Sequence, residues 1–184
     1  MAAGEAPLVR APGGLIPGKE RGWFVVNATE ARWKEWGNLG VYCPFEGKLP
    51  FLQLGINLNV LEPGQSLGRY HREPGHEEDF LVLEGECILI VSEQERPLRR
   101  WDFFHCPAGV AHMIVGAGDG PSVVLAVGTR GNGRGVSEGI VYPVSKLAAR
   151  HGVSVERETT KPGEAYADLP RAKKSVPYGG WLDA

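Results

Sequence analysis

The chain of 184 residues has the length and composition of one globular domain, with 42% apolar and 23% charged residues. Its net charge of −2 excludes the basic footprint of a nucleic-acid-binding protein. The sequence contains no run of about 18 apolar residues, so no membrane span is predicted. The first twenty residues lack the continuous apolar segment of a signal peptide, which favours a cytoplasmic protein.

The N-terminal part is predicted to be an arm followed by a strand and a short helix. Residues 1–20 are rich in Gly, Pro and Ala, which is typical of a flexible or loosely docked arm. Residues 22–27, with the sequence GWFVVN, are a strand candidate. Residues 27–36 predict a short helix, with Asn27 as its N-cap and Gly37 as its end.

The clearest predicted strand covers residues 51–61, where apolar and polar residues alternate with a period of two. One face carries leucine, isoleucine and valine, and the opposite face carries Asn57 and Asn59. If the apolar face points into the molecule, the cavity is apolar and Asn57 lies at the surface. If the apolar face meets a second subunit, the asparagines line a polar pocket. Both arrangements are compatible with the pattern.

Several short strands follow with almost no helix between them, which predicts an all-β sandwich or barrel. Cys87 and Cys106 fall in these apolar runs and are expected to be buried and free of disulfides. Residues 145–151 predict the one other helix. The tail beyond it contains Tyr166, Tyr178 and Trp181 and is expected to pack on the barrel or on a partner subunit. The predicted strands are 80–83, 87–91, 101–106, 113–115 and 123–127, with 140–144 as a further candidate.

Two histidine-bearing segments flank these central strands. On an extended chain His71 and Glu73 share a face because they are two residues apart, and Glu78 and Phe80 share a face of the next strand. His112 opens a later strand. Imidazole and carboxylate together suit Fe, Mn, Zn, Ni or Cu.

The spacing of these residues resembles the two sequence motifs of the cupin superfamily. The first segment reads His71-x-Glu73, four residues, Glu78, six residues and a glycine, where the family has a second histidine in place of Glu73. The second segment reads Trp101, five residues, Pro-x-Gly, two residues, His112, three residues and a glycine, where the family begins with glycine and ends with asparagine. The resemblance covers roughly residues 63–127.

This resemblance implies a double-stranded β-helix, or jelly-roll barrel. The expected organisation is an N-terminal arm over 1–20, the barrel over 21–144, and a C-terminal helix and tail over 145–184. It implies His71, Glu78 and His112 as metal ligands, with Glu73 at the fourth position. One divalent transition metal per chain, Fe, Mn, Ni or Zn, is expected to occupy such a site. A homodimer is also expected.

The implied function is that of a metal-dependent barrel acting on a small organic molecule, as a dioxygenase or an isomerase, with Glu73 as a candidate catalytic base. The alternative is a non-catalytic barrel that binds a small ligand, with a structural metal or none. A metal-free barrel with a hydrogen-bonded ligand remnant is the alternative for the site itself. The expected pocket residues are Tyr70, Phe80, Phe104 and Met113.

Two further segments have competing interpretations. His76 lies two residues before Glu78, so it is either an additional ligand or an exposed turn residue. The glycine-rich residues 128–139 follow a strand but open no helix, which favours a surface loop over a phosphate-binding loop. Arg130 and Arg134 in that loop could contact an acidic ligand.

Overall fold

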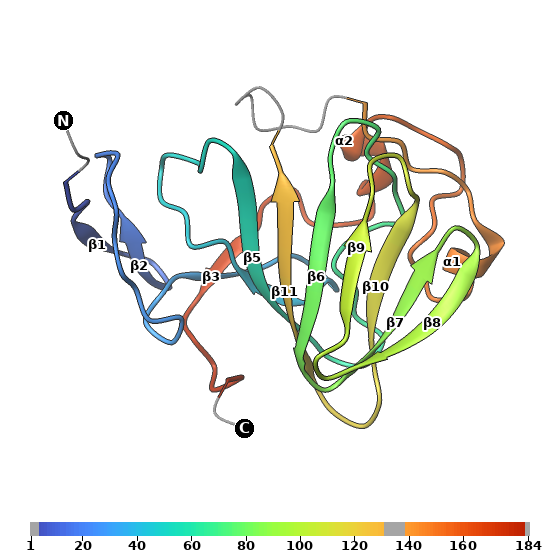
Figure 1. The fold of residues 1–184 in the computed structure, drawn as a ribbon, viewed down its shortest axis with the longest axis horizontal. Helices are drawn as coiled ribbons and strands as arrows, with labels where there is room; N and C mark the ends of the chain where they lie inside the picture. Colours follow the sequence, from blue (N-terminus) through green and yellow to red (C-terminus); the bar gives the residue numbers. More distant parts are fainter. Residues whose placement is uncertain (1–3, 131–138, 183–184) are drawn as a thin grey trace.

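The computed structural model describes residues 4–130 and 139–182, and its regular secondary structure is mostly β-strand (Figure 1). This confirms the predicted all-β class. Two short helices occur in the C-terminal part, α1 (Lys146–Arg150) and α2 (Pro162–Ala165). The strands are β1 (Leu8–Ala11), β2 (Gly14–Pro17), β3 (Trp33–Glu35), β4 (Val41–Cys43), β5 (Leu54–Leu61), β6 (Glu78–Glu84), β7 (Glu86–Val91), β8 (Gln94–Arg99), β9 (Phe103–Cys106), β10 (His112–Ala117), β11 (Ser122–Thr129) and β12 (Lys174–Val176).

The strands form two antiparallel sheets and a separate hairpin. The larger sheet has the order β12-β3-β4-β5-β11-β6-β9, and the smaller one has the order β10-β7-β8. The hairpin β1–β2 stands at the far end of the molecule from the smaller sheet (Figure 1). The core between the two sheets consists of buried apolar side chains, namely Leu61, Phe80, Val82, Cys87, Leu89, Cys106, Ile114 and Val124. This is the two-sheet jelly-roll architecture that the sequence predicts.

The two faces of β5 meet different surroundings, as its alternating sequence requires. Leu58 and Val60 are buried in a cluster around Trp33, which the chain itself forms from its N- and C-terminal segments. Asn57 and Asn59 lie on the opposite face and line a cavity. Of the two predicted arrangements, the polar pocket is therefore the one found. The apolar half of β5 that was expected to face a second subunit is covered by the chain's own arms at Leu58 and Val60, whereas Leu52 and Leu54 stay exposed.

The helix predicted over residues 27–36 is wrong. Asn27 does cap a single turn, because its Oδ1 accepts a hydrogen bond from Thr29 N at 2.9 Å. The chain then extends into β3, where Trp33 is fully buried against Tyr178 and Trp181. Burial of this indole between β4 and β12 outweighs the local helix signals, and tertiary packing of this kind commonly overrides propensity.

Other predicted boundaries also shift. Residues 22–27 form no strand and make one isolated bridge, between Glu5 and Trp23. Residues 140–144 make isolated bridges from Val141 to Arg72 and from Tyr142 to Thr159. Helix α1 is present, with the Ser145 hydroxyl accepting from Ala148 N at 2.9 Å as its N-cap. The three cysteines are all buried and free.

No helix within the described ranges is long and apolar enough to cross a membrane. Arg134 and most of the glycine-rich loop, residues 131–138, lie outside the described residues. Arg130 pairs with Glu46 at 2.8 Å and donates to the Phe51 carbonyl at 3.0 Å. It therefore ties the end of β11 to the segment before β5.

Candidate metal centre

Three predicted ligands come together at one end of the barrel. Glu78 is the first residue of β6, His112 is the first residue of β10, and His71 pairs with His112 through reciprocal backbone hydrogen bonds of 2.9 and 3.2 Å. One nitrogen or oxygen atom from each of these side chains lies within 4.8 Å of the others. The two strands that follow the turns at 74–75 and 107–109 thus carry their first side chains to the same point.

Both imidazoles are oriented by main-chain carbonyls. His71 Nδ1 lies 2.8 Å from the Arg69 carbonyl oxygen, and His112 Nδ1 lies 3.1 Å from the Val110 carbonyl oxygen. Because a carbonyl only accepts, the hydrogen of each neutral imidazole lies on Nδ1, and its Nε2 then keeps a lone pair. A carbonyl behind the imidazole is the usual support of a metal-binding histidine. The Cys106 thiol also lies 3.1 Å from His112 Nδ1, and burial raises the pKa of that thiol to about 12, so it is a neutral neighbour.

The charges at the site favour an ionised glutamate. Burial alone would raise the pKa of Glu78, but its contacts with His112 and His71 outweigh burial and lower the pKa far below its usual range. Burial alone would likewise lower the pKa of His71, whereas the Glu78 carboxylate outweighs it and raises the pKa. Each group therefore stabilises the charged form of the other.

Two buried atoms at the centre have no hydrogen bond within the described part of the chain, Glu78 Oε2 and His112 Nε2. They face each other at 3.1 Å, and Glu78 Oε2 lies 3.5 Å from His71 Nε2. Two atoms that bind one ion at about 2.0–2.2 Å each can be at most about 4.4 Å apart. A buried acceptor pair without donors costs free energy, and a cation between these atoms would satisfy both. The donor set therefore fits a divalent metal.

Glu73 and His76 lie beside this centre. Glu73 Oε1 is 3.9 Å from His71 Nε2, and Glu73 Oε2 is 3.5 Å from His76 Nδ1. Glu73 thus stays within reach of a metal held by His71, although it is outside the group of three mutually close ligands. His76 is buried, which corrects its interpretation as an exposed turn residue.

A cavity of about 120 Å³ opens onto the three ligands. Of the four predicted pocket residues, Phe80 and Met113 line it. Tyr70 instead packs into a second apolar cluster, where its hydroxyl lies 3.4 Å from Glu93 N. Phe104 stacks on Phe80 with ring centroids 5.8 Å apart and supports the wall from behind. The other lining residues are Asn57, Asn59, Leu67, Gly68, Ile114, Ala126 and Tyr166, besides the three ligands.

Tyr166 is the lining residue that comes from farthest away in the sequence. Its hydroxyl accepts a hydrogen bond from Arg69 N at 3.1 Å, and its ring meets the edge of Tyr142 with centroids 5.8 Å apart. Tyr142 in turn lies 6.0 Å from the His71 ring. The aromatic content of the tail was the sequence signal for such packing, but no motif indicated which aromatic residue reaches the site.

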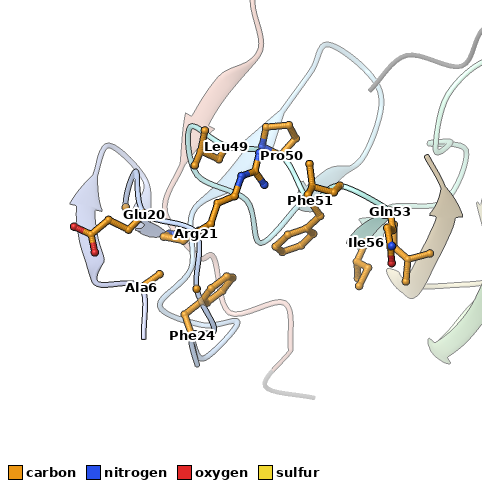
Figure 2. A pocket seen from close by; sticks show the side chains of 14 residues that line it. Ala6, Glu20, Arg21, Phe24, Leu49, Pro50, Phe51, Gln53 and Ile56 are labelled. Carbon is orange, nitrogen blue, oxygen red and sulfur yellow. The ribbon is translucent and has the colours of Figure 1, made fainter. Parts of the chain in front are cut away.

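A separate apolar groove of about 510 Å³ lies between the N-terminal segment and the start of β5 (Figure 2). Phe24 and Phe51 stack across it with ring centroids 6.2 Å apart. Figure 2 shows Leu49, Pro50 and Ile56 along the same groove. None of the candidate metal ligands lines it, so this groove is not part of the metal centre.

Comparison with known proteins identifies the central part of the chain. The cupin domain family matches residues 57–128, which contain all three candidate ligands. No curated protein matches the chain.

Several solved structures share parts of the fold. One is a protein of Acidithiobacillus ferrooxidans assigned as a sugar phosphate isomerase, with 33% identity over 42% of this chain and 51% of its own, and a TM-score of 0.41. Another is a cupin-superfamily sugar phosphate isomerase from Silicibacter pomeroyi, with 28% identity, 56% and 62% coverage, and a TM-score of 0.44. A third, from Thermotoga maritima and assigned as an oxalate decarboxylase, has 20% identity, 57% and 98% coverage, and a TM-score of 0.49. The chain thus spans between one half and two thirds of the two isomerase chains.

Proposed function

Because this chain belongs to the cupin superfamily, we propose that its barrel binds one divalent transition metal, Fe, Mn, Ni or Zn, through His71, Glu78 and His112. We propose further that the protein acts on a small organic molecule in the adjoining cavity, as a dioxygenase-like oxidoreductase or as an isomerase. The observation that carries both proposals is the convergence of three donor atoms, two of them without a hydrogen bond, at the wall of a cavity.

Three protein ligands leave coordination positions for a substrate, which is typical of catalytic rather than structural metal sites. The metal would supply a Lewis acid that polarises a substrate oxygen. Phe80 and Met113 contribute apolar side chains to the wall of the cavity. Asn59 Nδ2 donates to the carbonyls of Asn57 and Val124, at 3.2 and 3.1 Å, which leaves its Oδ1 to accept from a substrate hydroxyl.

For Glu73 two roles are compatible with its position, fourth ligand and acid–base group. The variant Glu73→Gln separates them. A ligand role requires the metal content to fall in this variant, whereas an acid–base role requires metal to stay and turnover to fall.

The decisive experiment is elemental analysis of protein purified without an affinity metal. We expect about one metal ion per chain in the wild type and loss of that metal in His112→Ala. His105→Ala is the matched control, because His105 is exposed, pairs with Asp79 at 2.7 Å and lies outside the cavity. Since His112 is buried, Glu78→Gln provides a second test that preserves side-chain volume, with circular dichroism to verify folding.

Equal metal content in wild type, His112→Ala and folded Glu78→Gln would reject this site. Metal-free protein that cannot be reloaded would do the same and would favour a ligand-binding barrel without metal. If metal is present, oxygen uptake during substrate screening separates the dioxygenase from the isomerase.

We also propose that the protein forms a homodimer through the groove of Figure 2. Strand β4 pairs only with Leu58–Val60 of β5, and no other described strand covers the first half of β5 on that side. An open strand edge beside exposed Leu52 and Leu54 favours addition of a strand from a second copy. Light scattering after size exclusion should give twice the chain mass of 19.9 kDa. Leu54→Glu should halve it, whereas Val144→Glu, also exposed but outside the groove, should not.

A further inference from the structure

A second cavity adjoins the metal centre and extends away from it. Its volume is about 200 Å³, and it shares four lining residues with the metal cavity, namely Asn57, Asn59, Leu67 and Tyr166. At its other end it is lined by Trp36, Tyr42 and Lys173. Together the two cavities correspond to the small end of the size range of ligand sites. A small molecule bound at the metal would therefore extend toward these three residues.

Lys173 is held in this cavity by the strand pairing of the C-terminal arm. Strand β12 pairs with β3 so that Lys174 lies opposite Glu35, which places the preceding Lys173 beside Trp36. Its Nζ lies 4.6 Å from the centroid of the Trp36 ring and 5.2 Å from that of Tyr42. Trp36 is itself fixed, because its indole N–H donates to the Pro170 carbonyl at 2.6 Å. The ammonium group therefore has a defined position.

No carboxylate in the described ranges lies within 4.0 Å of the Lys173 ammonium group. Other lysines of the arm differ, because Lys174 pairs with Glu35 at 3.9 Å and Lys161 pairs with Glu164 at 2.9 Å. Partial burial by the two rings lowers the pKa of Lys173. Lys173 thus lines the cavity with an ammonium group that no described carboxylate neutralises, which favours binding of an anion there.

We propose that Lys173 binds the anionic group, a carboxylate or a phosphate, of a small ligand whose other end reaches the metal centre. The ligand then has a metal-binding head of oxygen atoms and an anionic tail. Asn57, Asn59 and Tyr166 lie between the two ends and contact its middle. This proposal rests on the proposed function for the head of the ligand only, since the anion subsite is formed by residues outside the metal centre.

Calorimetry on Mn²⁺-loaded protein tests the tail with matched probes. The carboxylate pair is 2-oxoglutarate and 5-methyl-2-oxohexanoate, which replaces the tail carboxylate by an uncharged group of the same shape. The phosphate pair is 3-phosphoglycerate and glycerate. We expect the member with the anionic tail to bind about tenfold tighter to the wild type in at least one pair. The pair that shows the preference identifies the tail.

Lys173→Met removes the charge but keeps an apolar stem, so it should abolish the preference and leave binding of the probes with uncharged tails unchanged. Lys174→Met is the control, because Lys174 is exposed like Lys173 but lines neither cavity. Equal binding of probes with charged and uncharged tails to the wild type, or a preference that persists in Lys173→Met, would overturn the proposal. Unchanged Mn²⁺ affinity in Lys173→Met verifies that the metal centre is intact.

A metal-free measurement separates failure of this proposal from failure of the metal site. Inorganic phosphate should shift the indole N–H resonance of Trp36, assigned with Trp36→Phe, in metal-free wild type. The shift should be absent in Lys173→Met and present in Lys174→Met. If Mn²⁺ does not bind but this shift occurs, the proposed function fails and the anion subsite stands. If Mn²⁺ binds and neither the shift nor the tail preference occurs, the anion subsite is wrong and the metal site stands.

Discussion

The region matched by the cupin family, residues 57–128, and the arms on either side of it contribute different parts of the site. The matched region carries His71, Glu78 and His112 within a span of 42 residues, each at the start of a strand or beside a turn. The arms carry Trp36, Tyr166 and Lys173, which reach the cavity only through long-range packing. The candidate ligands thus lie in the matched region, and the arms add Trp36, Tyr166 and Lys173 to cavity walls that the matched region also forms.

Strand β5 is where the two regions meet. Its Asn57 and Asn59 face the cavities, and its Leu58 and Val60 face the Trp33 cluster of the arms. The same strand therefore forms part of the site and of the arm docking surface. Damage to the Trp33 cluster of the arms should therefore lower the stability of the protein and change the shape of the cavity, while the candidate metal ligands remain in place.

Trp33→Ala should have the largest effect, because Trp33 is fully buried and contacts Tyr178 and Trp181 at ring distances of 6.1 and 5.0 Å. Loss of a buried tryptophan costs about 3–5 kcal/mol of unfolding free energy. Urea denaturation measures this loss, and metal content measured alongside reports on the barrel. Trp23→Ala, at an indole that is 55% exposed, is the control and should change stability by less than about 0.5 kcal/mol.

The shape of the urea unfolding transition of Trp33→Ala shows whether the arms and the barrel unfold together. A single shifted transition means that arms and barrel unfold together. Two transitions, with metal retained after the first, mean that the arms detach from an intact barrel. A loss below about 1 kcal/mol would contradict the packing described for the arm cluster.

The sequence predicted the matched region well because its information is local. Alternation along residues 51–61 and turns at fixed offsets from the histidines specify strands and ligand positions within short segments. For the arms, prediction from local patterns was less successful. Asn27 and the residues after it satisfy local helix rules, but the structure buries Trp33 in a strand. Lys173 could not be placed because its position depends on the pairing of β12 with β3, and Tyr166 could not be placed because it depends on contacts with Arg69 and Tyr142. No local pattern encodes these long-range contacts. Tyr70, which the sequence predicts to face the pocket, instead packs into a separate apolar cluster. Alternation sends it and its neighbour His71 to opposite faces.

The smallest predicted effect concerns the link between the two regions at Arg69. Arg69 lies two residues before His71. Its buried guanidinium donates to the Gly152 carbonyl at 2.6 Å, to the Ala165 carbonyl at 3.3 Å and to Asp168 at 2.5 Å. The hydrogen bond from Arg69 lowers the pKa of Asp168. The stabilisation is therefore present above the carboxyl pKa of the unfolded chain, about 3.9, and is lost as the pH falls through the lower folded value.

Thermal unfolding of wild type and Asp168→Asn between pH 7 and pH 3 measures this contribution as a difference. Asp168 is 61% exposed, so solvent screening limits the difference to about 1 kcal/mol or less at neutral pH. It should begin to shrink as the pH falls below about 4, because the carboxyl of the unfolded chain gains a proton there and that of the folded chain gains one only at lower pH. Asp119→Asn, in the exposed turn between β10 and β11, should show no such pH-dependent difference. A difference that stays constant down to pH 3 would mean that Asp168 holds the arm to the barrel by shape and hydrogen bonding rather than by its charge.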